Sequence, residues 1–271
     1  MTKDIKKLAF HPKTLDEEIV RDSLEAVSQL EDREPIYLIG GVATQSYLPT
    51  LCRRPTSDID YALVRPLGYP DFREIIKPVS EFLQDKGYSF ETKKGSRASM
   101  LIIHDYQRFE SLAIEFARKN ENSFQKRKKM LEREFDHTKT KIIEGRDKTY
   151  KTACPEDLVI PKIARSINSL YRNSSLNKFL PSRLESLSNE DVRRALEEIR
   201  FLREEAMINP GDVGIAEKLR FVSDLYDARI LAEITGFNED YLKLIEKEWL
   251  TINAKPKLRD KIFNVTFPVS K

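Results

Sequence analysis

The chain has 271 residues, of which 34% are charged and 40% are hydrophobic. This length can bury one large core or two modest ones, and the balance is typical of a soluble globular protein. No apolar run approaches the roughly 20 residues that a membrane-spanning helix needs, so we expect no membrane partner. The first residues lack the apolar stretch of a signal peptide, and Cys52 and Cys154 are the only cysteines. We therefore expect a cytoplasmic protein with reduced thiols and no structural zinc site.

The formal net charge is only +3, but the charge is unevenly distributed. Residues 118–151 contain 12 Lys or Arg and 6 Asp or Glu, a local net charge of +6, so the rest of the chain sums to −3. Within this segment, the run Lys126-Arg127-Lys128-Lys129 is the best candidate for contacts with nucleic-acid phosphates. A solvated helix face is the alternative, and charge alone favours that alternative.

Hydrophobic periodicity predicts alternating helices and strands in the first half of the chain. Positions with a period near 3.6 residues predict helices over residues 14–31, 42–48, 71–86 and 122–135. Short apolar or alternating runs predict strands over residues 36–39, 59–64, 89–93, 99–104, 112–116, 139–143 and 149–152. From Pro155 onward the pattern is almost purely helical.

This change of pattern near Ala153 predicts two domains. We expect a mixed sheet with flanking helices over residues 1–153, and a helical bundle over residues 154–271. The predicted fold class is therefore α+β.

Asp58 and Asp60 lie within a predicted strand that otherwise suits burial. Residues two apart in a strand point to the same face, so the two carboxylates project together, with starting points about 6.5–7 Å apart, while Ile59 points into the core. This spacing suits oxygen ligands for one or two Mg²⁺ ions, which prefer carboxylates together with phosphate oxygens. The pair therefore indicates chemistry on a phosphate-bearing substrate.

Two further features could complete such a site. Glu115 alternates with apolar residues in a predicted strand, so it could be a third metal ligand, or it could lie on a solvent-facing side of the strand. The pair Gly40-Gly41 joins a strand to a helix and could let a triphosphate approach the backbone. An ordinary turn is the alternative for the glycine pair.

The order of these features resembles the DNA polymerase beta-like nucleotidyltransferase superfamily. The resemblance rests on the glycine pair and on the run Arg54-Pro55-Thr56-Ser57-Asp58-Ile59-Asp60, with 17 residues from Gly41 to Asp58. Within that superfamily the chain resembles the AbiEii family of nucleotidyltransferases, which includes the MenT toxins. The segment Pro155-Glu156-Asp157-Leu158 with Lys162, and the later segment KLRFVSDLYDARIL, carry that likeness.

The resemblance implies a role for each matching residue. Nucleotide phosphates would be bound by Gly40, Gly41, Thr56, Ser57 and Lys162. Magnesium would be held by Asp58, Asp60 and, as third acid, Glu115, although the superfamily often has aspartate there. The catalytic set would be Asp58, Asp60, Lys162 and Asp224.

Asp224 and Asp227 share a helix face, and either would position the acceptor or act as base. A salt bridge from this pair to Lys218 or Arg220 is the alternative. The resemblance predicts a Mg²⁺-dependent enzyme that transfers a nucleoside monophosphate from an NTP to an acceptor hydroxyl. It suggests a toxin that acts on tRNA and is paired with an antitoxin. Two rival functions stay open: a non-catalytic nucleotide- or RNA-binding protein, and an enzyme that modifies a small molecule or a protein.

Overall fold

The computed structural model describes residues 12–96, 98–117, 120–179 and 188–267. The chain folds into two compact units. The first, the sheet unit, comprises Met1–Ser46 and Pro55–Cys154, and the second, the helical unit, comprises Tyr47–Arg54 and Pro155–Lys271. The division lies one residue beyond the boundary expected from the sequence, and it groups an eight-residue segment from the first half with the helices.

The described part of the sheet unit contains a seven-stranded sheet in the order β3-β4-β5-β2-β1-β7-β6. Its strands are β1 (Ile36–Ile39), β2 (Asp58–Leu63), β3 (Ser89–Lys94), β4 (Ala98–Asp105), β5 (Glu110–Ala117), β6 (Lys139–Ile142) and β7 (Thr149–Thr152). Two neighbouring pairs, β2 with β5 and β1 with β7, run parallel, and the other pairs run antiparallel. Every strand predicted from the sequence is present, which confirms the mixed sheet.

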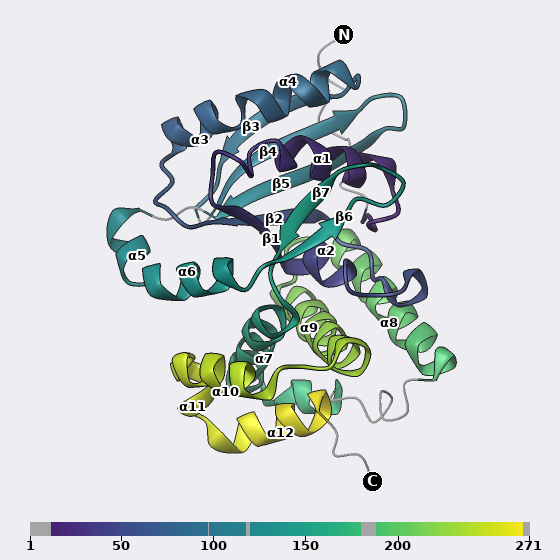
Figure 1. Ribbon diagram of the computed structural model, residues 1–271. Helices are drawn as coiled ribbons and strands as arrows, with labels where there is room; N and C mark the ends of the chain where they lie inside the picture. The colour runs from purple at the N-terminus through teal and green to yellow at the C-terminus, as the bar shows by residue number, and fades with distance from the viewer. Residues whose placement is uncertain (1–11, 97, 118–119, 180–187, 268–271) are drawn as a thin grey trace. The chain divides into compact units, whose positions relative to one another are not determined.

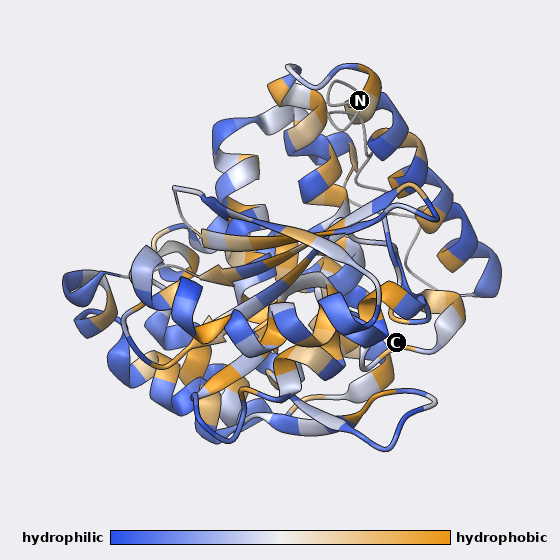
Figure 2. Ribbon diagram, turned by 90° about the horizontal axis from the view of Figure 1, so that it is seen from above, coloured by the Kyte–Doolittle hydropathy of each residue, from blue (hydrophilic) through white to orange (hydrophobic). Residues whose placement is uncertain are grey.

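The middle strands are apolar along much of their length (Figure 2), as expected for strands covered on both faces. The helices of this unit are α1 (Glu18–Ser28), α2 (Gly40–Gln45), α3 (Tyr69–Ile75), α4 (Lys77–Asp85), α5 (Glu121–Gln125) and α6 (Lys128–Asp136). Helix α1 packs on α4, β5 and β7, and α2 packs on β1 and β2. This packing places α2 beside the strand that carries Asp58 and Asp60.

Two predicted helices are each divided in two. The continuous helix expected over residues 71–86 is wrong: α3 ends at Ile75, and α4 begins at Lys77 with Pro78 in its first turn, where proline is tolerated. The helix expected over residues 122–135 is likewise two helices, α5 and α6, which separate at Lys126 and Arg127.

The helical unit consists of helices packed around a central pair. Its members are η2 (Thr50–Cys52), α7 (Pro155–Arg172), η3 (Ser174–Phe179), α8 (Asn189–Ile208), α9 (Val213–Thr235), α10 (Glu239–Glu248), α11 (Leu250–Asn253) and α12 (Pro256–Thr266). Helices α7 and α9 lie side by side (Figure 1) and make the most extensive contact in the unit. With the sheet unit, this confirms the α+β class. Within the described residues, no helix combines the length and apolarity needed to cross a lipid bilayer.

The segment Tyr47–Arg54 is fixed to the helical unit by two polar contacts. The Tyr226 hydroxyl on α9 donates a hydrogen bond of 2.8 Å to the Cys52 carbonyl. Arg54 donates two hydrogen bonds of 2.7 Å to the Asp227 carboxylate. The short helix η2 also packs against α8. These contacts explain why eight residues between α2 and β2 fold with the helices.

Candidate functional site

The two strand aspartates lie side by side on one face of β2. Asp58 and Asp60 are partly exposed, whereas Ile59 and Tyr61 between and after them are buried. The alternation of burial is the one predicted from the sequence, because Ile59 carries the packing and leaves both carboxylates on the opposite face.

Glu115 occupies the matching position on the neighbouring strand. Strands β2 and β5 are parallel, and Asp60 is the register partner of Glu115. Paired strands lie only about 4.8 Å apart, so the carboxylates of the two strands share one face at short range. Burial, and secondly the charge of Asp58, raise the pKa of Glu115 above its ordinary value. The face therefore concentrates negative charge.

The glycine pair makes room for two polar side chains, Asp60 within β2 and Thr56 just before it. Gly40 has φ +75°, and a Cβ atom there would lie 2.1 Å from Asp60 Oδ2. A Cβ atom on Gly41 would lie 3.0 Å from Thr56 Oγ1. The sequence suggested a phosphate cradle or an ordinary turn, and the structure gives the pair a defined neighbour: any larger residue at Gly40 would displace the Asp60 carboxylate.

Thr56 orients the first aspartate. It is buried, and its hydroxyl donates a hydrogen bond of 2.8 Å to Asp58 Oδ1. Ser57, for which the sequence predicts a nucleotide-binding role, is exposed. A threonine that donates to a carboxylate oxygen fixes its rotamer, which is the support that a metal ligand needs.

The carboxylates of this face are suited to magnesium as a pair of ligands. Among the residues that the structure describes, no group of three or more His, Cys, Asp or Glu side chains is arranged so that it could hold a metal ion. Magnesium, however, is usually bound through one or two carboxylates, with substrate phosphates and water completing the shell. The pair Asp58 and Asp60 fits that arrangement, and Glu115 as a third ligand stays a prediction.

Lys162, predicted to contact nucleotide phosphates, lies in α7 within the helical unit. Its side chain is buried, and its ammonium donates a hydrogen bond of 2.7 Å to Asp227 Oδ2. It also lies 4.0 Å from Asp224 Oδ1. In this structure the charge of Lys162 is thus balanced by carboxylates of α9.

Asp224 and Asp227 are both engaged in ion pairs, but with other partners than the sequence suggested. Arg165 on α7 makes two hydrogen bonds of 2.8 Å to Asp224, and Arg54 binds Asp227 bidentately. Burial alone would raise the pKa of Asp227, but the charges of Arg54 and Lys162 outweigh burial and lower it. The alternative drawn from the sequence, a salt bridge to Lys218 or Arg220, is right in kind but not in partner, because the pairing side chains come from α7 and from the segment before β2.

The acidic residues that open α7 hold another helix. Glu156 accepts a hydrogen bond of 2.7 Å from the Asn238 backbone amide, and Asp157 accepts one of 2.8 Å from the Tyr241 hydroxyl. Both contacts tie α7 to the start of α10. Two carboxylates in the first turn of α7 therefore stabilise the helical unit.

The basic run lies at the junction between α5 and α6. Lys126, Arg127, Lys128 and Lys129 are all exposed. Helix α6 is anchored from its other side, because the buried Tyr37 of β1 donates a hydrogen bond of 2.6 Å to Glu134. No acidic residue lies in the first turn of α6. The partial positive charge at the N-terminus of this helix therefore adds to the charge of the lysines. Arg118 and Lys119 of the basic segment lie outside the described residues.

Sequence reasoning missed three residues that shape these sites: Lys13, Arg54 as a partner of Asp227, and Arg165. Arg54 and Asp227 are 173 residues apart, and Arg165 and Asp224 are 59 residues apart. Lys13 pairs with Glu17, four residues further along the chain, and with the distant Glu110. Periodicity within one segment carries no signal for the distant pairs.

Comparison with known proteins yields only weak structural similarities. No protein-family model matches the chain, and no curated protein matches it. Among solved structures, an antigenic nucleotidyltransferase-like protein from Paracoccidioides brasiliensis is similar, with a TM-score of 0.39 and 14% identity, over 95% of this chain and 99% of that one. JHP933 from Helicobacter pylori is similar, with a TM-score of 0.33 and 12% identity, over 92% of this chain and 86% of that one. Likenesses of this size assign neither activity nor substrate to the chain.

Proposed function

We propose that the protein is a magnesium-dependent nucleotidyltransferase. The observation that carries the proposal is the carboxylate face of the sheet: Asp58 and Asp60 on β2, beside Glu115, with Gly40 leaving space for Asp60. Like charges at this range disfavour each other's ionised form, and the charge of Asp58 helps to raise the pKa of Glu115. A cation with substrate phosphates would relieve this repulsion.

In the proposed reaction the acceptor hydroxyl attacks the α-phosphorus of the NTP. The new bond joins the acceptor oxygen to that phosphorus, and the bond to the bridging oxygen of the β-phosphate breaks so that pyrophosphate leaves. The hydroxyl proton passes to a general base, a role suggested for Asp224. Such transfer depends mainly on positioning and charge neutralisation. Bound magnesium would neutralise charge that develops on the phosphates. Asp58 and Asp60 would hold it, and Thr56 would keep Asp58 in place.

The finer predictions extend this proposal. The likeness to the AbiEii family suggests that Lys162 binds phosphate and that Asp224 positions the acceptor or acts as base. Both side chains hold charge partners in the helical unit, so these roles require those pairs to open when substrate binds. The same likeness suggests a toxin with a cognate antitoxin, and the exposed basic run favours tRNA as acceptor.

The test is a labelling reaction with the full chain. Purified protein is incubated with each α-labelled NTP, Mg²⁺ and total tRNA, beside Asp58→Asn and the control Asp85→Asn. Asp85 is an exposed aspartate on α4. We expect label on tRNA with wild type and the control. The loss with Asp58→Asn should exceed the roughly 10–100-fold that removal of an outer-shell partner of a metal costs.

Folding is checked in parallel by circular dichroism. Asp58→Asn removes a charge that raises the pKa of Glu115, so we expect its melting temperature to equal or exceed that of wild type. Full labelling by folded Asp58→Asn protein would refute the catalytic assignment. Magnesium-dependent NTP binding without transfer to RNA, small-molecule or protein acceptors would favour the binding-only alternative.

A further inference from the structure

A buried lysine bridges the segment before α1 and the start of β5. The Lys13 side chain is 3% exposed, and its Nζ lies 2.9 Å from Glu17 Oε2 and 2.5 Å from Glu110 Oε2. Glu110 is the first residue of β5, the strand that carries Glu115. Burial alone would lower the pKa of Lys13, but the two glutamates outweigh burial and raise it. The ammonium group is therefore charged throughout the neutral pH range.

The backbone of the same residue is paired with the approach to β2. Lys13 and Thr56 form an antiparallel bridge, with N–H···O distances of 2.6 Å and 2.8 Å in the two directions. Thr56 is two residues before Asp58 and donates the hydrogen bond that orients it. Lys13 thus contacts the start of β2 through its backbone and the start of β5 through its side chain.

Strands β2 and β5 have no short covalent connection. They run parallel and are separated in sequence by α3, α4, β3 and β4, so no tight turn links their ends. Their shared face carries the carboxylates that repel each other. Backbone hydrogen bonds between β2 and β5 hold the two strands together. No short covalent link fixes how the first residues of the two strands align.

The segment around Lys13 is itself held firmly. Gln45, which is buried at the end of α2, accepts a hydrogen bond of 2.7 Å from the Leu15 backbone amide. Helix α2 is the helix that opens with the glycine pair. The chain before α1 is therefore tied to three elements that surround the carboxylate face: α2, β2 and β5.

We propose that Lys13 is a positioning residue, which fastens the starts of β2 and β5 together and so sets the spacing of the carboxylates on the two strands. Its relevance to catalysis rests on the proposed function. Lys13 does not contact the reacting atoms. It acts through Thr56 on Asp58, and through Glu110 on the strand of Glu115.

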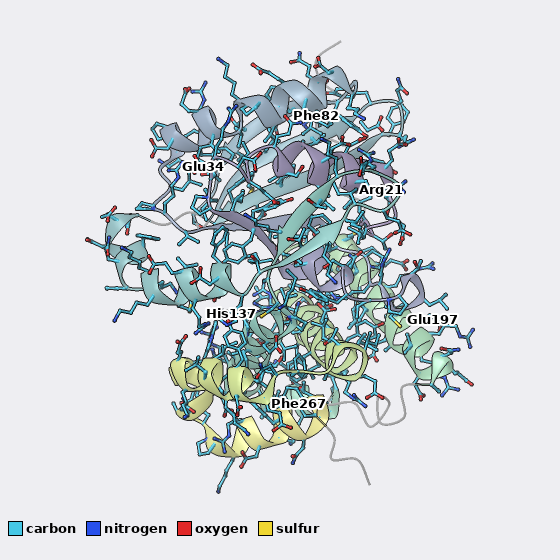
Figure 3. All side chains as sticks on the ribbon, in the orientation of Figure 1. Arg21, Glu34, Phe82, His137, Glu197 and Phe267 are labelled. Carbon is cyan, nitrogen blue, oxygen red and sulfur yellow. The ribbon has the colours of Figure 1, made fainter. Side chains whose placement is uncertain are left out.

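The test compares Lys13→Met with Arg65→Met in the full chain. Methionine keeps most of the apolar stem but removes the ammonium. Arg65, two residues after the end of β2, makes two hydrogen bonds of 2.6 Å and 2.9 Å to Glu34 (labelled in Figure 3). The Arg65→Met variant therefore breaks a comparable ion pair near the other end of the strand. Binding of Mn²⁺ is measured by electron paramagnetic resonance, well below both melting temperatures.

We expect Lys13→Met to bind Mn²⁺ about 10-fold more weakly or worse, as for other outer-shell changes, and Arg65→Met to bind it as wild type does. Equal Mn²⁺ affinity in all three proteins would overturn the inference. If Lys13→Met does not fold, Glu110→Gln, which removes one of the two lysine partners, replaces it with the same expected direction.

Amide hydrogen exchange separates this inference from the proposed function. In Lys13→Met we expect faster exchange at Thr56 and in β5, with other strands unchanged. If wild type binds no Mn²⁺, the proposed metal site fails, and exchange alone decides the role of Lys13. Uniform or unchanged exchange would then overturn it.

Discussion

Gly40 is the residue at which backbone conformation and site chemistry meet. Its φ of +75° is a region that L side chains rarely adopt, and a Cβ atom would lie 2.1 Å from Asp60 Oδ2. We expect Gly40→Ala to lose about 1–3 kcal/mol of stability from backbone strain alone. It should also lose Mn²⁺ binding, because the Asp60 carboxylate must move.

Gly87→Ala separates the two effects. Gly87 has φ +90°, but a Cβ atom there would meet nothing within 4 Å. This variant should show a similar loss of stability in urea unfolding while it keeps wild-type Mn²⁺ affinity. Equal Mn²⁺ affinity in the two variants would show that the space beside Asp60 is not needed.

Single residues were predictable from the sequence where a local pattern carried the information. The two-residue spacing of Asp58 and Asp60 within an apolar strand predicted their shared face correctly. The contact between Gly40 and Asp60, and the pairing of Arg54 with Asp227, were not predictable. They depend on which distant segments become neighbours, and periodicity within one segment does not contain that information.

At the scale of elements, Glu31 links the turn after α1 to β7. Its carboxylate accepts a hydrogen bond of 2.8 Å from the Lys151 backbone amide. Burial, opposed by that hydrogen bond, raises the pKa of Glu31 to about 7 from an ordinary value of 4.5. Folding therefore favours the protonated form of Glu31. The contribution of this group to the free energy of unfolding is fully present below pH 4.5.

Between pH 4.5 and about 7, Glu31 loses its proton in the unfolded chain but keeps it in the folded protein. The free energy of unfolding that comes from protonated Glu31 is therefore lost as pH rises through this range. Glu31→Gln keeps an acceptor for the Lys151 amide and removes the ionisation. We expect this variant to gain stability relative to wild type across that pH range, with a constant difference above it. Urea unfolding at several pH values measures this, with exposed Glu91→Gln on β3 as control. Parallel pH profiles of Glu31→Gln and wild type would contradict the assignment.

The sequence predicted the elements more reliably than their continuity. All seven strands were anticipated, because alternation and apolar runs report directly on burial in a sheet. The breaks between α3 and α4, and between α5 and α6, were missed. A side-chain pattern reports which face is buried, and it can continue across a backbone break when both helices cover the same core.

At the scale of the whole molecule, the distribution of charge predicts where a polyanion binds. The net charge of +3 combines +6 in residues 118–151 with −3 elsewhere. If tRNA is the acceptor, as proposed, neutralising Lys126, Lys128 and Lys129 of the basic run to glutamine should weaken tRNA binding. It should also reduce the slope of log K against log salt by about 2–3, since each lost phosphate contact contributes about 0.7–0.9.

The matched control removes the same charge from another exposed surface of the sheet unit, at Lys77, Lys93 and Lys94. That triple variant should bind tRNA with a nearly unchanged slope. Filter binding between low and moderate salt measures both variants. Similar losses in the two would mean that tRNA responds only to net charge, and that the basic run is not its binding surface.

The eight residues that leave the sheet unit between α2 and β2 have a practical consequence for anyone dividing this protein. No single cut in the chain separates the two units, because each is assembled from discontinuous stretches. A fragment that stops at Cys154 would retain Arg54 without Asp227, and the Cys52 carbonyl without the Tyr226 hydroxyl. A fragment that starts at Pro155 would bury Asp227 and Lys162 without the arginine that completes their cluster. Neither unit can therefore be produced as one continuous fragment that contains all of its own residues and none of the other's.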